Sequence, residues 1–211
     1  YSRILVPAMH IGGWYDIFRD GDIRLFGGLK SHAGSTRARE NQKLVMGPWY
    51  HSPWTSILGP CDLGEAAANR IDDLQLKWFD HWLKGMENRI MDEPRVRYYM
   101  LGENTWRDDP SWPPEKTRLR TLYLHSGGRA NSLSGNGFLS SELPEDESTD
   151  VYVYNPRDPI PSLGGQSCCM TGITPMGPAD QRQVEAANQV LVYTTPPLEV
   201  PFCIAGNIAV I

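Results

Sequence analysis

Two stretches of sequence, HIGGWYDIF at residues 10–18 and VMGPWYHSP at residues 45–53, decide how this chain folds and where its chemistry lies. In each stretch a short apolar or glycine-rich run is followed by one polar side chain, Asp16 in the first and His51 in the second. A carboxylate after one buried strand and an imidazole after the next are two of the three groups of a nucleophilic triad, in which the carboxylate orients the imidazole. The sequence therefore predicts an Asp–His pair at the ends of two strands.

The segments around this pair alternate between strand and helix patterns. The run Arg3–Ile11 predicts a buried strand whose pairing starts late or is irregular, because Pro7 has no N–H to donate. An imperfect helix is expected from about residue 17 to residue 30. The run KLVMG (43–47) predicts a second strand, which turns at Gly47 and Pro48 into a loop that contains His51.

The clearest helical pattern in the chain is Glu65–Lys84. Apolar residues recur there at spacings of three and four, and the sequence Lys84-Gly85 gives a natural helix end. The apolar positions are Ile71, Leu74, Trp78 and Trp82. Alternation of strand, helix, strand and helix is typical of an α/β domain.

The pattern changes near Asp92. Short β-branched and aromatic runs follow, separated by Gly, Pro, Ser and Asp clusters, as in all-β sandwiches. They include RVRYYML (95–101), VYVYNP (151–156) and QVLVYTTPPL (189–198). We therefore expect an α/β domain at residues 1–91 and a β-sandwich domain at residues 92–211.

The composition excludes several classes of function. The net charge is −5 and no basic patch is interleaved with aromatics, so nucleic acid is not an expected partner. No apolar run reaches the ~18 residues of a membrane span. The four cysteines, Cys61, Cys168, Cys169 and Cys203, lack metal-ligand spacing, so no metal site is expected.

Residue patterns alone leave other roles open for the pair. Asp16 is equally suited to capping the helix that follows, and a lone histidine such as His51 is most often a packed structural residue. Asp20 and Asp22 fall inside the expected helix and should face solvent. The aromatic residues beside the pair, Trp14, Tyr15, Trp49 and Tyr50, are candidates to line a largely apolar substrate site.

A nucleophile for the pair is absent from these 211 residues. The G-x-S-x-G turn, which presents the serine of α/β-hydrolases, does not occur in the sequence. In that fold the chain order is Ser, then Asp, then His. We therefore expect the serine to lie upstream and the 211 residues to be an internal fragment that is inactive alone.

Several motifs, spread over nearly the whole chain and in order, resemble those of one enzyme family. They are VPAMHIGGWYDIF, GPWYHSP, LKWFDHWLKG, GENTWR, SWPP, VYNPRDPIPSLGG and GPADQRQVE. The family is that of cocaine esterase, X-Pro dipeptidyl-peptidase and α-amino acid ester hydrolase. The resemblance implies an α/β-hydrolase domain followed by a C-terminal jelly roll, which here is truncated. It maps the triad Asp onto Asp16 and the triad His onto His51.

The same resemblance implies a serine hydrolase that forms an acyl-enzyme and needs no cofactor. Its substrate would be a small ester, an amide or a short peptide. Location, in the cytoplasm or outside the cell, and assembly into homo-oligomers are left open. An alternative function is a carbohydrate- or protein-binding module on a catalytically dead scaffold, with Trp106 and Trp112 as stacking platforms.

Overall fold

The computed structural model describes residues 1–52, 54–168 and 176–211. The chain forms two compact units, and each is described by itself. The first unit contains Tyr1–Lys116, Gly164–Ala179 and Gly206–Ile211; the second contains Thr117–Leu163 and Asp180–Ala205. No helix in the described ranges is both long enough and apolar enough to cross a membrane.

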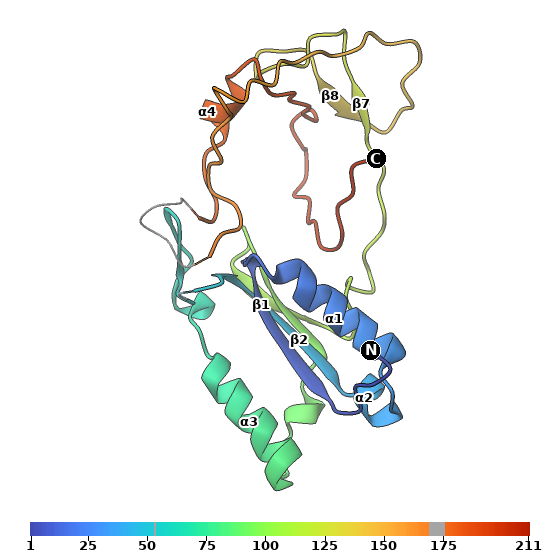
Figure 1. Cartoon of the computed structure of the whole chain (residues 1–211), viewed down its shortest axis with the longest axis vertical. Coiled ribbons are helices and arrows are strands. Elements are labelled where there is room, and N and C mark those ends of the chain that lie inside the picture. The colour runs from blue at the N-terminus through green and yellow to red at the C-terminus, as the bar shows by residue number, and fades with distance from the viewer. Residues whose placement is uncertain (53, 169–175) are drawn as a thin grey trace. The chain divides into compact units, whose positions relative to one another are not determined.

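The first unit is built around a four-stranded sheet in the order β1-β2-β5-β6 (Figure 1). The strands are β1 (Ala8–Tyr15), β2 (Gln42–Tyr50), β5 (Val96–Met100) and β6 (Thr105–Asp109). Strands β1, β2 and β5 run parallel, and β6 returns antiparallel to β5. A short hairpin, β3 (Ile57–Leu58) and β4 (Cys61–Asp62), follows β2.

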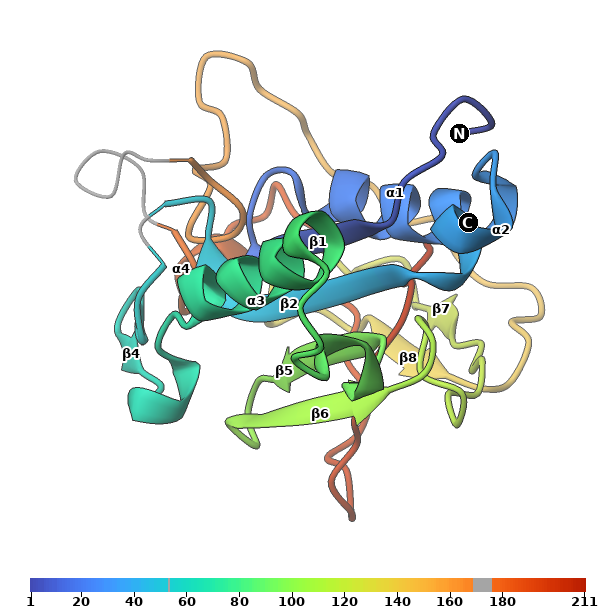
Figure 2. The ribbon, with the colours of Figure 1, turned by 90° about the horizontal axis from the view of Figure 1, so that it is seen from below.

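Helices cover both faces of this sheet. Helices α1 (Arg19–His32) and α2 (Thr36–Glu40) lie on one face and α3 (Ile71–Lys84) on the other, as Figure 2 shows from a second direction. Strand β2 is buried along its whole length, because alternate side chains point to the two helical layers. Val45 and Trp49 pack against Ile71 of α3, whereas Met46 lies on the α1 side near Gly12.

Two expectations about the strands have different outcomes. Strand β1 begins at Ala8, directly after Pro7, so the late start of pairing is confirmed. The turn predicted at Gly47 and Pro48 is wrong, because β2 continues through both residues to Tyr50. Pairing of β2 with β5 ends at Met46, so the missing N–H of Pro48 costs no bond to that neighbour.

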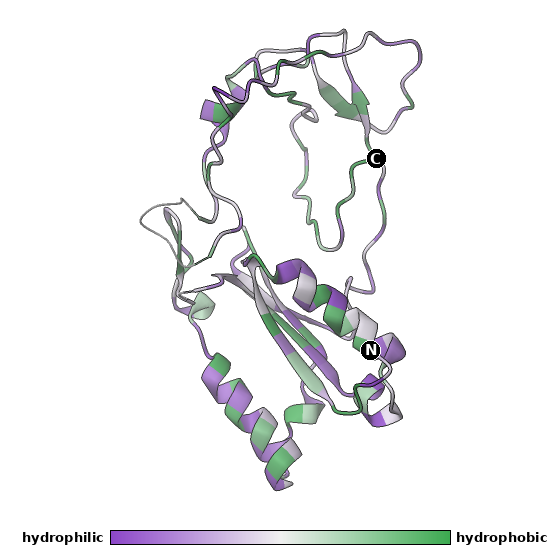
Figure 3. Ribbon diagram, viewed as in Figure 1, coloured by the Kyte–Doolittle hydropathy of each residue, from purple (hydrophilic) through white to green (hydrophobic). Residues whose placement is uncertain are grey.

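Helix α3 begins later than its sequence pattern suggests. The residues predicted to form its first turn make a separate 3₁₀ turn, Glu65–Ala67, and Ala68 is extended. The side chain of Asn69 accepts a hydrogen bond from the Ile71 N–H at 2.7 Å, which starts the helix there. Gly85 ends it in the left-handed conformation, as predicted. Hydrophobic and hydrophilic residues alternate along α3 in Figure 3.

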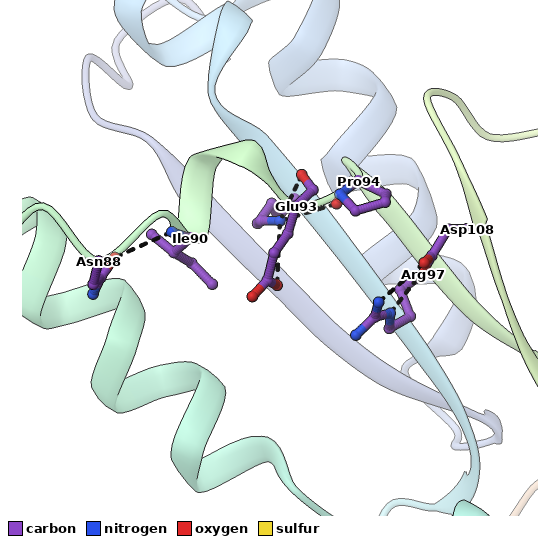
Figure 4. A network of polar contacts seen from close by, with 7 residues as sticks. Asn88, Ile90, Glu93, Pro94, Arg97 and Asp108 are labelled. Atoms are coloured by element: carbon purple, nitrogen blue, oxygen red, sulfur yellow. Dashed lines mark hydrogen bonds and ion pairs between the residues drawn. The ribbon is translucent and has the colours of Figure 1, made fainter.

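A buried lysine ties β2 to the segment that leads into β5. Lys43 Nζ donates to the carbonyl oxygens of Glu93 and Pro94, at 3.1 and 2.9 Å, and Glu93 Oε2 lies 3.9 Å away. Burial lowers the pKa of Lys43, and the charge of Glu93 opposes this. Figure 4 shows Glu93 and Pro94 together with the two-bond ion pair of Arg97 on β5 with Asp108 on β6. These polar contacts hold β2, β5 and β6 together just after the chain leaves the 3₁₀ turn Ile90–Asp92.

The boundary expected near Asp92 stays a prediction. Strands β5 and β6 lie beyond it in sequence, yet they complete the sheet of β1 and β2. Trp106 packs within this first unit: its ring contacts Trp49 and Tyr99, and its indole N–H donates to the Ala66 carbonyl at 2.7 Å.

The second unit has little regular structure in its described residues. It contains the strand pair β7 (Tyr123–His125) and β8 (Phe138–Ser140), the helix α4 (Arg182–Glu185) and isolated bridges. The strand predicted at residues 151–156 is wrong: these residues are irregular and exposed, because no partner strand covers their apolar side chains. The α/β class with a β-containing second part is confirmed, whereas the jelly roll stays a prediction.

A polar network organises this second unit. His125 contacts Glu147 Oε1 through Nδ1 at 2.6 Å and the Glu142 carbonyl through Nε2 at 2.9 Å. Because both ring nitrogens face acceptors, the hydrogen bond with Glu147 raises the pKa of His125. Asp150 accepts bonds from Ser126 and from Tyr193, whose pKa burial raises to about 12.

Candidate active site

Asp16 lies in the turn between β1 and α1. Its N–H donates to the Gly13 carbonyl, and its Oδ1 accepts a hydrogen bond from the Phe18 N–H at 2.8 Å. This contact closes a two-residue turn before α1. It is not the helix cap that the sequence left open for Asp16, because the N-cap of α1 is Phe18 and no side chain caps the helix. Asp16 is only 3% exposed, and its second carboxylate oxygen is free for another partner.

That partner is His51, which directly follows β2. His51 Nδ1 lies 3.2 Å from Asp16 Oδ2, so one carboxylate both closes its own turn and contacts the imidazole. The His51 side chain is 38% exposed, and the Phe18 ring packs against it in a T-shaped arrangement. Within the described part of the chain, His51 Nε2 has no hydrogen-bond partner.

The sheet register explains why the two residues meet. Gly13 pairs with Gly47, but Tyr15 pairs with Tyr50, so β2 contains an extra residue at this point. This irregularity aligns the ends of the two strands and puts the next residue of each, Asp16 and His51, side by side. A Cβ on Gly13 would lie 2.1 Å from the Trp49 carbonyl oxygen, so only glycine allows this close approach.

The arrangement suits a general base. A carboxylate accepts hydrogen bonds but donates none, so its contact with Nδ1 favours the tautomer that has its proton on Nδ1. The lone pair of His51 Nε2 then remains available to take a proton from a nucleophile. Asp16 would stabilise the imidazolium that results.

The four aromatic residues proposed to line the site are mostly engaged elsewhere. Trp49 is buried and donates from its indole N–H to the Ala67 carbonyl at 2.7 Å. Trp14 donates in the same way to the Tyr99 carbonyl at 2.6 Å. Tyr50 is buried with Leu58 and Met176, and Tyr15 packs against this cluster. Their role in substrate binding stays a prediction.

Asp22 was expected to face solvent, and this expectation is wrong. Its carboxylate turns toward the sheet, and a Cβ on Gly12 would lie 2.6 Å from Asp22 Oδ2. Partial burial, reinforced by the charge of Asp16, raises the pKa of Asp22 to about 6, while His51 opposes the rise. Its position in the first turn of α1 after Asp16 was the available signal.

The raised pKa of Asp22 predicts a pH-dependent effect on stability. The folded protein binds this proton more tightly than the unfolded chain, so the contribution of Asp22 to stability is greatest at low pH. That contribution is lost as the pH rises through about 6. We expect Asp22→Asn, which cannot ionise, to raise the urea midpoint relative to wild type more at pH 7.5 than at pH 4.5. Urea unfolding of both proteins at the two pH values measures the difference.

Asp20→Asn is the matched control, because Asp20 is an exposed aspartate two positions earlier in the same helix. It should change the midpoint by similar amounts at both pH values. If the difference in urea midpoint between Asp22→Asn and wild type were the same at both pH values, the raised pKa of Asp22 would be contradicted.

Gln166 also touches the site but was not expected there. Its Nε2 donates to the Asp16 carbonyl oxygen at 2.9 Å across 150 residues of sequence. No local pattern could have indicated a contact over that separation.

Comparisons with known proteins identify the family of the chain. The family model described as the X-Pro dipeptidyl-peptidase C-terminal non-catalytic domain matches residues 88–211, more than half of the chain. The chain belongs to the X-Pro dipeptidyl-peptidase family. A second model, X-Pro dipeptidyl-peptidase (S15 family), matches residues 1–53, which include both Asp16 and His51. The resemblance found in the sequence is therefore confirmed.

Individual relatives in this X-Pro dipeptidyl-peptidase family align with different shares of the chain. A cocaine esterase of a Rhodococcus species is 35% identical over 209 residues, 98% of this chain and 35% of that protein. A putative Xaa-Pro dipeptidyl-peptidase of Bacillus cereus is 39% identical over 61 residues, 26% of this chain and 10% of that protein.

One solved structure is similar over most of the chain. It is an aminopeptidase from a marine sediment archaeon (Thaumarchaeota), with 26% identity and a TM-score of 0.66. The match covers 93% of this chain and 31% of that one. The chain thus spans about a third of the length of the first relatives it matches.

Proposed function

We propose that this chain belongs to a serine hydrolase that cleaves ester or amide bonds through an acyl-enzyme, with Asp16 and His51 as two members of the triad. The observation that supports this most directly is the 3.2 Å contact between His51 Nδ1 and Asp16 Oδ2 at the ends of neighbouring parallel strands. Relatives named as an esterase and as a dipeptidyl-peptidase support the hydrolase class.

In the proposed mechanism the nucleophile is a serine outside these 211 residues. As its oxygen attacks the acyl carbon, His51 Nε2 takes the hydroxyl proton and then gives it to the departing alcohol or amine. A water molecule, deprotonated by the same nitrogen, then releases the acyl group and restores the serine. Asp16 keeps the imidazole oriented and offsets its positive charge throughout.

The substrate would be a small ester, an amide or a short peptide, including peptides with proline in the second position. No metal or organic cofactor is required for this chemistry. Without the serine and an oxyanion hole, the 211 residues alone are expected to be inactive. The binding-module alternative depended on Trp106 and Trp112 as exposed platforms. The Trp112 ring instead packs against Trp14 and Tyr98, which does not favour a stacking platform.

The proposal is tested by removing the base. His51→Ala in the full-length protein should lower the turnover of a p-nitrophenyl ester at least about 100-fold, because general bases contribute 10²–10⁴-fold. His32→Ala, which removes an exposed histidine at the end of α1, is the control and should leave turnover unchanged. Activity of His51→Ala within about tenfold of wild type would exclude His51 as the base.

A further inference from the structure

A bracket of backbone from late in the sequence lies against the Asp16–His51 pair. We use the term bracket for residues 164–167 together with Met176 and Gly177, all within the first unit. Gly165 and Gly177 exchange two backbone hydrogen bonds, at 2.8 and 3.0 Å, and this bridge holds the two parts together. Both glycines have positive φ, 84° and 82°, a conformation that other residues rarely adopt.

One part of the bracket rests on Tyr50, the residue directly before His51. The Tyr50 hydroxyl donates to the Met176 carbonyl at 3.4 Å and accepts the N–H of Gly59. A Cβ on Gly177 would lie 3.1 Å from the same hydroxyl oxygen. Met176, Tyr50 and Leu58 form one buried cluster, so the bracket is packed against the end of β2.

The other part of the bracket reaches the residues at the end of β1. The Ser167 N–H donates to the Tyr15 carbonyl at 3.3 Å, and Gln166 Nε2 donates to the Asp16 carbonyl at 2.9 Å. The Asp16 carbonyl also accepts the Arg19 N–H at 3.2 Å. Gln166 therefore adds a second donor to the turn that sets the direction of the Asp16 carboxylate.

The bracket thus contacts the chain beside both members of the pair: at Asp16 itself and at Tyr50, the residue before His51. We propose that Gln166 is a positioning residue, which holds the Asp16 turn so that Oδ2 stays directed at His51 Nδ1. This inference rests on the proposed function of the pair. Gln166 lies in the part of the chain that matches a domain described as non-catalytic. The inference therefore gives that part a role in aligning the catalytic groups.

The test uses Gln166→Met and Gln166→Ala in the full-length protein. Methionine keeps the length and most of the volume of glutamine but has no N–H to donate, so it separates the hydrogen bond from packing. We expect both variants to lower kcat roughly tenfold with KM changed less than about twofold, because misalignment of a catalytic group acts mainly on the chemical step. Gln189→Met, whose amide bonds to Asp158 in the second unit, is the matched control.

A second readout does not depend on turnover. The imidazole N–H proton between His51 and Asp16 should give a downfield proton NMR signal, and the loss of that signal in His51→Ala would identify it. In Gln166→Met this signal should move or broaden, and in Gln189→Met it should stay in place. A Gln166→Met protein with wild-type kcat and an unchanged signal would overturn the inference. Full activity of His51→Ala would instead overturn the proposed function, whatever Gln166→Met does.

Discussion

Asp16→Asn in the full-length protein is expected to lower kcat by up to about 10⁴-fold while leaving the fold intact. The Asn carbonyl oxygen can still accept the Phe18 N–H, so the turn is kept, but the amide then presents N–H groups to His51. The imidazole would have to turn its lone pair on Nδ1 toward the amide and hold its proton on Nε2. In that tautomer it cannot accept a proton from a nucleophile, which is why the loss of rate is large.

The matched control for this change is Asp62→Asn. Asp62 Oδ1 accepts the Gly64 N–H at 2.9 Å, the same two-residue turn as at Asp16, but no histidine contacts its carboxylate. Measuring kcat for both variants, with circular dichroism as the check on folding, separates the effect of changing the turn from the effect of changing the contact with His51. Equal losses in the two variants, or an Asp16→Asn rate within tenfold of wild type, would contradict the role of Asp16.

The Asp16–His51 pair could be predicted from the sequence because the information for it is local. Each residue directly follows a short buried strand, and parallel strands that are neighbours end at the same edge of a sheet. The alternatives weighed for Asp16 were a helix cap and a catalytic carboxylate. The structure has the contact with His51 and, in place of the helix cap, a two-residue turn closed by the Phe18 N–H, because the two oxygens of one carboxylate face different partners.

What the sequence did not predict depends on contacts between distant segments. Gln166 meets Asp16 across 150 residues, and the burial of Asp22 follows from the packing of α1 on β1. Strand β2 can continue through Pro48 because its pairing with β5 has already ended at Met46, which no local pattern reports. Strands β5 and β6 lie within the residues expected to form the sandwich, yet they join the first sheet through contacts with segments far away in the sequence.

Gly13→Ala is expected to destabilise the protein by about 3 kcal/mol, the upper part of the range for overpacking in a core. The new Cβ would lie 2.1 Å from the Trp49 carbonyl oxygen and 2.6 Å from its carbon. These are backbone atoms of β2, so no side-chain rotation relieves the clash, and the two strands must separate locally. The separation occurs three residues before Asp16 and two before His51, so the 3.2 Å contact should lengthen as well.

Gly21→Ala is the control, because it makes the same chemical change where nothing lies within 4 Å of the new Cβ. Gly21 is in α1, so alanine there should stabilise the protein by up to about 1 kcal/mol. Urea unfolding of both variants gives the two free energies. The two changes in the free energy of unfolding should have opposite signs, because the methyl group of Gly13→Ala meets the backbone of β2 and that of Gly21→Ala meets solvent. A Gly13→Ala protein as stable as wild type would mean that the strands do not approach so closely beside the pair.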